Sequence, residues 1–221
     1  MYKFFFKRAI DFTLSLISLI ILTPILLPVI IVLSITGENH VFYFQERIGY
    51  KNSKFRIIKF ATMLKNSPNI GTKLHTTTTD PRVLPFGKFL RKTKINELPQ
   101  LFNILIGDMS VIGPRPLVDK TFEPYSENIK NSIYNIKPGL SGIGSVIFRN
   151  EEELMSNTQM NLNDYYREKI APYKGELELW YQKNISFITD FKIILITIWI
   201  VFFPKSNVIK IFFKDLPKNK I

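Results

Sequence analysis

The strongest pattern in the chain is an apolar run near its N-terminus. No residue from Phe12 to Thr36 is charged, and a helix needs about 20 apolar residues to cross a bilayer. The run is too long for the apolar part of a secretory signal, and no small-residue cleavage site follows it. Basic residues flank both of its ends, and positive charge marks the cytoplasmic side of a membrane.

Two prolines interrupt this run. Pro24 and Pro28 each remove a backbone hydrogen bond and favour a kink. Together with the basic flanks, they allow two interpretations. The first is a re-entrant helix that breaks at Thr23 and Pro24 and returns to the same side of the membrane. The second is a kinked helix that spans the bilayer. Charge and periodicity alone support the two interpretations equally.

The clearest soluble helix is predicted from Glu97 to Ile106. Its apolar residues recur at helical spacing and form one face: Leu98, Leu101, Phe102 and Leu105. Asn96 is placed to cap the start of this helix, and Gly107 to end it. Upstream, residues 41–44 and 55–60 are typical of short strands, and residues 65–81 of a polar loop.

The C-terminal part is predicted to be mostly helical. Residues 165–183 form a helix that is interrupted near Pro172. Residues 185–203 are apolar but carry Asp190 and Lys192, which favours an interfacial amphipathic helix, with a buried core helix as the alternative. The basic tail that follows is suited to an anionic leaflet.

The net charge and the composition limit the classes of ligand and site that this chain can have. The net charge is +12, which suits a phosphorylated substrate, anionic lipid or nucleic acid. The sequence contains no Cys, so thiolate chemistry and disulfides are excluded. With two His residues in all, the composition argues against a His-rich zinc site.

Candidate chemistry gathers around Arg91, Asn96, Glu97 and Arg115. A helix N-terminus attracts anions, and arginine binds phosphate through two parallel hydrogen bonds. A carboxylate among these groups indicates Mg²⁺, which takes oxygen ligands and is usually shared with substrate phosphates. The residues therefore predict a phosphate site at a membrane surface. The alternative is an ordinary capped helix with solvated arginines.

The stretch LRKTKINELPQLFNILIGDMSVIGPRP resembles the signature of the bacterial sugar transferases, the monotopic polyprenyl-phosphate phosphoglycosyl transferases. The resemblance covers nearly the whole chain, including KRAIDF, FQERIG, DPRVLPFGKFLRKT and KPGLSGIG. It implies an enzyme that transfers a sugar 1-phosphate from a nucleotide sugar, commonly a UDP-sugar, to undecaprenyl or another polyprenyl phosphate. This reaction is the first membrane step of surface glycan assembly, such as exopolysaccharide biosynthesis.

The resemblance also implies where the parts lie. The active domain would face the cytoplasm at the bacterial inner membrane, and Mg²⁺ would be the cofactor. By position, Arg91 and Arg115 would bind substrate phosphates, Lys59 and Arg47 would lie near them, and Arg149 would follow the Pro-Gly motif. The family's re-entrant helix breaks at a Ser-Pro pair, which Thr23-Pro24 matches, so the re-entrant interpretation is favoured.

The expected fold class is therefore α+β. A re-entrant membrane helix, residues 1–38, packs on a small, mixed, mostly helical cytoplasmic domain, residues 39–184. An interfacial helix and basic tail, residues 185–221, complete the chain.

Three departures from the family's pattern bear on mechanism. Asn96 stands where the family has Asp, its nucleophile and magnesium ligand. Residues 142–149 replace the family's usual Gly-Trp-Ala-Gln-Val-Asn-Gly-Arg, and Ala61 replaces a basic residue. We therefore predict direct in-line attack by the lipid phosphate. Glu97 would hold Mg²⁺ and Asn96 would orient a phosphate, with Glu97 as nucleophile the weaker alternative.

Two other functions compete with the transferase. A pseudoenzyme would retain the membrane scaffold and bind lipid or a partner without turnover. Nucleic-acid binding rests on charge alone, and no recognition motif supports it. The sequence identifies neither the sugar nor the nucleotide, and it leaves the oligomeric state, including a homo-oligomer, open.

Overall fold

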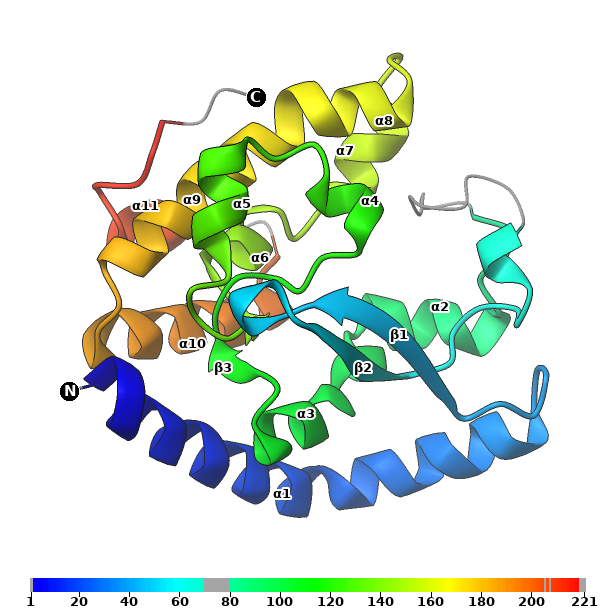
Figure 1. Ribbon diagram of the computed structural model, residues 1–221. Coiled ribbons are helices and arrows are strands. Elements are labelled where there is room, and N and C mark those ends of the chain that lie inside the picture. Colours follow the sequence, from blue (N-terminus) through cyan, green and yellow to red (C-terminus); the bar gives the residue numbers. More distant parts are fainter. Residues whose placement is uncertain (1, 70–79, 205, 207, 219–221) are drawn as a thin grey trace.

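The computed structural model describes residues 2–69, 80–204, 206 and 208–218. Parts of the predicted polar loop, residues 65–81, and of the basic tail therefore lie outside the described residues. One long helix runs along one side of the molecule, and short helices and two small sheets form a compact part above it (Figure 1). This arrangement agrees with the expected mixed, mostly helical fold.

The long helix is α1 (Lys7–Ile35), preceded by a π-helical turn at Tyr2–Phe6. It is the one helix, among the described residues, that is long and apolar enough to cross a membrane. Where the sequence predicts a break, at Thr23 and Pro24, the backbone stays helical and the helix follows a shallow curve (Figure 1). The hydroxyl of Thr23 donates to the Leu19 carbonyl at 2.7 Å, in the turn where Pro24 has no N–H to donate.

One face of α1 packs on the compact part along its whole length. The buried residues recur at helical spacing from one end to the other: Lys7, Asp11, Ser15, Leu19, Leu26, Val29 and Leu33. Three polar side chains secure the first turns. Lys7 pairs with Asp190, Arg8 donates to the carbonyls at the end of α3, and Asp11 accepts the amide of Val111.

An antiparallel hairpin covers the other end of α1. Its strands are β1 (Phe42–Ile48) and β2 (Lys54–Phe60), joined through a 3₁₀ turn at Tyr50–Asn52, with Phe44 opposite Ile58. Both strands were predicted, and both are longer than predicted. A second sheet pairs β3 (Ser110–Ile112) in parallel with β4 (Gly139–Ser141).

The helix predicted at Glu97–Ile106 is wrong in its first turn. A 3₁₀ turn, η4 (Ile95–Glu97), comes first, and α3 (Gln100–Ile106) follows. Pro99 has no N–H to continue an α-helical bond pattern back to Ile95, so α3 begins after it. Asn96 consequently lies inside the 3₁₀ turn and is not the helix cap. Gly107 ends α3 at φ 99°, as predicted.

The buried face of α3 also differs from the prediction. Leu101 and Ile104 are buried, whereas Phe102 is 47% exposed. The prediction placed Phe102 on the same apolar face as Leu101. The helix instead packs on α1 and β2 on one side and leaves Phe102 and Ile106 on the outer surface.

The remaining helices build the second half of the compact part. They are α2 (Pro85–Lys92), the 3₁₀ turn η3 (Ser67–Asn69), α4 (Asp119–Phe122), α5 (Glu127–Ile133), α6 (Ile143–Ile147), α7 (Glu151–Asn157), α8 (Leu162–Tyr165), α9 (Ala171–Lys183), α10 (Phe187–Phe202) and α11 (Val208–Phe212). A π-helical turn at Tyr166–Ile170 leads into α9, close to the interruption predicted near Pro172.

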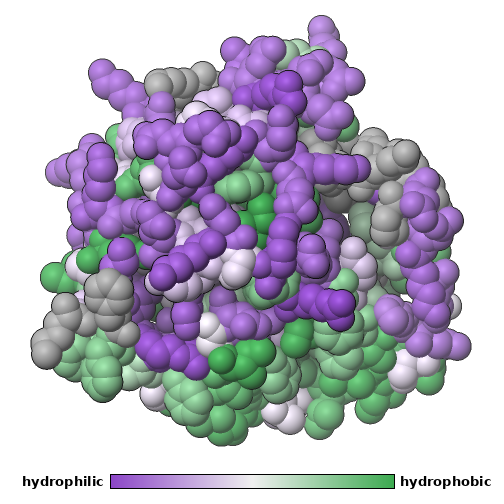
Figure 2. Space-filling model, viewed as in Figure 1, coloured by the Kyte–Doolittle hydropathy of each residue, from purple (hydrophilic) through white to green (hydrophobic). Residues whose placement is uncertain are grey.

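Helix α10 is half buried. Ile193, Ile196 and Ile200 pack into the core, while Ile188 and Phe202 are exposed. Its exposed side continues the apolar surface of α1, which gathers along the lower edge of the molecule in Figure 2. An amphipathic helix that shares an apolar surface with α1 agrees with the interfacial interpretation better than with a buried core helix.

Candidate functional site

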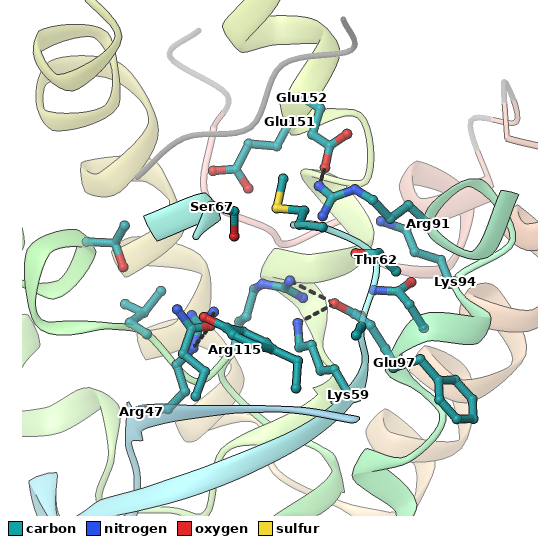
Figure 3. A pocket seen from close by; sticks show the side chains of 18 of the residues that line it. Arg47, Lys59, Thr62, Ser67, Arg91, Lys94, Glu97, Arg115, Glu151 and Glu152 are labelled. Carbon is teal, nitrogen blue, oxygen red and sulfur yellow. Dashed lines mark hydrogen bonds and ion pairs between the residues drawn. The ribbon is translucent and has the colours of Figure 1, made fainter. Parts of the chain in front are cut away.

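A polar cavity of about 460 Å³ lies between the hairpin, the η4 turn and α7 (Figure 3). Six of the seven predicted catalytic and phosphate-binding residues line it: Arg47, Lys59, Arg91, Asn96, Glu97 and Arg115. They come from separate elements, since β1 carries Arg47, β2 carries Lys59, and the last turn of α2 carries Arg91.

Glu97 lies at the centre of this cavity. Its Oε1 accepts from Lys59 Nζ at 2.9 Å and from Arg115 Nη2 at 3.1 Å (Figure 3). Burial alone would raise the pKa of Glu97, but Lys59, Arg115 and Lys94 hold that pKa well below its usual value. Glu97 is therefore a fixed anion within a strongly positive site.

The segment that carries Arg115 is fixed by close backbone packing. A Cβ on Gly113 would lie 2.4 Å from the Lys137 carbonyl oxygen, so the close approach of these two backbone segments requires glycine at position 113. The Tyr134 hydroxyl donates to the Arg115 carbonyl and accepts the Leu117 amide. The stiff Gly-Pro-Arg-Pro segment thus presents the guanidinium to Glu97.

Burial in the same cavity also shifts the pKa values of two cationic side chains, Lys59 and Arg47. Burial lowers the pKa of Lys59 to about 8, despite the opposing attraction of Glu97. Burial and the nearby Arg115 lower the pKa of Arg47 to about 10. Arg47 donates to the Pro116 carbonyl at 3.0 Å, and Arg91 pairs with Glu152. These positive charges are held close together, as a site for a diphosphate requires.

A second, apolar cavity of about 580 Å³ adjoins the first. Its walls come from α1, η4 and α10, and they include Leu22, Leu98 and Ile198. Arg149 lies here and not in the polar cavity, and burial lowers its pKa. The cavity is bordered by residues of the exposed apolar surface, such as Phe202.

The two cavities share a wall of charged side chains. Six described residues line both cavities: the cations Lys94, Arg115 and Lys174, and the carboxylates Glu97, Glu151 and Glu152. Glu151 pairs with Lys174 at 2.6 Å, and Figure 3 shows both α7 carboxylates across the polar cavity from Glu97. A phosphate can therefore meet ionised groups from either cavity.

The sequence did not single out four of these shared residues. Lys94 follows α2 in a left-handed conformation, at φ 61°, beside the η4 turn. Glu151 and Glu152 begin α7, and Lys174 lies on α9. The run of three acidic residues at 151–153, two positions after Arg149, is the local signal that points to Glu151 and Glu152.

The polar cavity contains oxygen atoms of the kind that bind a divalent cation. The Oδ1 of Asn96 is buried without a hydrogen-bond partner, and both cations of Glu97 contact Oε1, not Oε2. No group of three or more His, Cys, Asp or Glu side chains suited to a metal occurs within the described part of the chain. This donor set fits Mg²⁺ that is shared with substrate phosphates, not a cation held by protein alone.

The comparisons with known proteins identify the family. Residues 2–204 match the family described as bacterial sugar transferase. The chain is 32% identical over 206 residues to the UDP-glucose:undecaprenyl-phosphate glucose-1-phosphate transferase of Klebsiella pneumoniae, covering 91% of this chain and 41% of the relative. It is 34% identical over 159 residues to the exopolysaccharide production protein ExoY of Sinorhizobium fredii, covering 66% of this chain and 70% of the relative.

A third relative has a different sugar in its name. The UDP-N-acetylgalactosamine-undecaprenyl-phosphate N-acetylgalactosaminephosphotransferase of Aeromonas hydrophila is 33% identical over 188 residues, covering 84% of this chain and 43% of the relative. The chain thus spans less than half the length of the Klebsiella pneumoniae and Aeromonas hydrophila relatives. The family match nevertheless extends over nearly the whole chain, and the chain belongs to the bacterial sugar transferase family.

Proposed function

We propose that this protein transfers a sugar 1-phosphate from a nucleotide sugar, most simply a UDP-sugar, to undecaprenyl or another polyprenyl phosphate. The transfer would be the first membrane step of surface glycan assembly. The observation that carries this proposal is the charged wall between a polar and an apolar cavity. Its two sides suit a soluble diphosphate and a lipid phosphate that must meet at one point.

The polar cavity suits the nucleotide sugar. Its cations, above all Lys59, Arg115 and Arg47, neutralise a diphosphate, and Glu97 orients two of them. The apolar cavity suits the isoprenoid part of the acceptor, since its walls from α1 and α10 continue the exposed apolar surface. Arg149 would then hold the lipid phosphate close to Arg115.

Mg²⁺ is the cofactor that we propose for this site. Glu97 and the amide oxygen of Asn96 would hold it, and the donor and acceptor phosphates would supply further ligands. When bound, Mg²⁺ offsets negative charge on the diphosphate. Lys59 and Arg115 orient Glu97 through its other oxygen.

We also propose that α1 is re-entrant: it enters the inner membrane and returns along its shallow curve without crossing, so that both of its ends and the compact part lie on the cytoplasmic face. Burial from Lys7 to Leu33 supports this topology, because the compact part contacts α1 near both ends. A spanning helix would carry one end about 30 Å across the bilayer, away from that contact. The basic flanks of the helix agree with this placement.

Acceptor-dependent nucleotide release tests the reaction. Purified protein in lipid nanodiscs would be mixed with undecaprenyl phosphate, Mg²⁺ and a panel of UDP-sugars, and release of uridine monophosphate followed. We expect release with at least one donor, together with a lipid diphosphate sugar, and loss of both in Glu97→Gln. No release with any nucleotide sugar would contradict the proposal.

The scaffold alternative receives no support from the comparisons, since the transferases among the relatives are named for catalysis. The same assay distinguishes it. A wild-type protein without turnover, alongside an active Asn96→Asp variant, would favour a scaffold that lost its chemistry at position 96.

A further inference from the structure

We propose that Glu151 is the nucleophile of the transfer and supplies the carboxylate that position 96 lacks. This inference rests on the proposed function and names a residue of the same site. It would replace the direct attack by lipid phosphate that Asn96 alone suggests, because the structure brings a further carboxylate to the junction of the two cavities.

The first argument is position. A nucleophile in a two-step transfer takes the phosphosugar from the nucleotide and delivers it to the lipid, so both substrates must reach it. Only residues on the shared wall meet this condition, and the described carboxylates on that wall are Glu97, Glu151 and Glu152. Asn96, by contrast, lines the polar cavity and not the apolar one.

The second argument separates the three carboxylates. Glu97 is paired with Lys59 and Arg115, and it lines the polar cavity together with Asn96, whose buried oxygen has no partner, which suits metal binding. Glu152 pairs with Arg91, and its side chain is 46% exposed. The side chain of Glu151 is 29% exposed and thus better shielded from water, which would hydrolyse an acyl phosphate.

The third argument is the support that Glu151 receives. Lys174 is buried, lies over the rings of Phe148 and Tyr166, and holds the Glu151 carboxylate at 2.6 Å. This contact holds the carboxylate in place and supplies a positive charge beside the phosphoryl group that it attacks. Glu97 raises the pKa of Arg115 most, and Glu151 raises that pKa further, which places Glu151 within the field of the same guanidinium.

The two steps balance. In the first, a Glu151 oxygen attacks the sugar-bearing phosphorus, the bond from that phosphorus to the bridging oxygen breaks, and nucleoside monophosphate leaves with the electron pair. The product is an acyl phosphate that joins Glu151 to the sugar 1-phosphate. In the second step, an oxygen of polyprenyl phosphate attacks the same phosphorus. The bond between that phosphorus and the Glu151 oxygen breaks, and the Glu151 carboxylate is restored. No net proton is taken up or released.

Trapping the intermediate tests this assignment on the wild-type protein. The protein would be incubated with the active UDP-sugar and Mg²⁺ but without lipid acceptor, then treated with hydroxylamine and digested for mass spectrometry. We expect a burst of about one nucleoside monophosphate per protein and a hydroxamate on the peptide at Glu151. A hydroxamate at Glu97 or elsewhere, or turnover without any adduct, would overturn the assignment and leave the proposed function standing.

Two variants complete the test. Glu151→Gln keeps the shape of the side chain, and we expect it to bind donor, to form no adduct and to lose turnover by about 10³-fold or more. Glu153→Gln is the matched control, since Glu153 is an exposed residue of the same helix; it should turn over and form the adduct as wild type does. Turnover of Glu151→Gln within about tenfold of wild type would overturn the inference.

Discussion

Lys7 and Asp190, which are 183 positions apart, form a buried ion pair at 2.5 Å. The pair joins the first turn of α1 to the first turn of α10, the two helices that provide most of the exposed apolar surface. The hydroxyls of Tyr2 and Tyr181 also donate to Asp190, so its charge is well satisfied. The pair therefore fixes how these two apolar helices lie relative to each other.

Breaking this pair should destabilise the fold strongly. Lys7→Met leaves a buried carboxylate without its cation, and such a loss costs about 3–5 kcal/mol of unfolding free energy. The double variant Lys7→Met/Asp190→Asn should recover part of that loss. Denaturant unfolding in detergent measures it, with Lys88→Met as the control because Lys88 is exposed. Equal stability of Lys7→Met and Lys88→Met would contradict the role of the pair.

Local sequence predicted much of the fold, and long-range contacts account for the rest. The apolar run predicted α1, two short segments typical of strands predicted the two strands of the hairpin, and Gly107 predicted the end of α3. Periodicity could not show that Pro99 would turn the first residues of the predicted helix into a 3₁₀ turn. It also could not place Phe102, because an apolar residue on the surface gives the same signal in sequence as one in a core.

Arg115→Ala and Arg91→Ala should each lower turnover by about tenfold or more and leave membrane attachment intact. Each variant removes a charge-assisted contact to phosphate, which is worth about 1.5–3 kcal/mol. The effect of Arg115→Ala should be the larger, because Arg115 also orients Glu97 and lines both cavities. Steady-state kinetics with membrane fractionation measures both properties.

The control for these variants is Arg56→Ala, since Arg56 is an exposed residue of β2. It should behave as wild type does in both measurements. Wild-type turnover in Arg115→Ala or Arg91→Ala would remove that arginine from the site.

At alkaline pH, kcat/KM for the nucleotide sugar should fall because Lys59 loses its charge. Burial lowers its pKa to about 8, so Lys59 is protonated below that pH and loses its charge as the pH rises above it. The attraction for the donor diphosphate then falls, and kcat/KM should decrease by up to about tenfold per pH unit above pH 8. Lys59→Arg should extend activity to higher pH, because guanidinium stays charged. An unchanged pH profile in this variant would exclude Lys59 as the group responsible.

The re-entrant topology predicts that both ends of α1 are hidden from the cell exterior. The chain contains no Cys, so single-cysteine variants report cleanly. Lys3→Cys and Glu153→Cys, both at exposed positions, should resist a membrane-impermeant maleimide in intact spheroplasts and react after lysis. Reaction of Lys3→Cys, but not of Glu153→Cys, in intact spheroplasts would mean that α1 spans the membrane.

The site was predicted in part, for a physical reason. Motif residues such as Glu97 and Arg115 lie close together in sequence, and the structure brings them into contact. Glu151 and Lys174 reach the same wall from α7 and α9, and they pair across 23 positions. Charged residues on short helices resemble any solvated surface in sequence, so their role becomes visible only when the two cavities are seen to share them.

Asn96→Asp should strengthen the binding of Mg²⁺. The Oδ1 of Asn96 is buried and has no hydrogen-bond partner, and Asn96 lines the same cavity as Glu97, so a carboxylate there would place a second anion at the proposed metal site. Without metal, two buried carboxylates in one cavity repel each other, which raises the pKa of one of them. We therefore expect the variant to be less stable than wild type in EDTA and to gain more stability on titration with Mg²⁺. Its apparent affinity for Mg²⁺ should be at least about tenfold higher, because Mg²⁺ favours anionic oxygen ligands.

Thermal unfolding followed over a range of Mg²⁺ concentrations measures this change in affinity without any assay of activity. Asn96→Ala is the comparison, since it removes the oxygen and should show the weakest response to Mg²⁺. If all three proteins respond alike, position 96 does not contact the metal, and its amide serves the η4 turn alone.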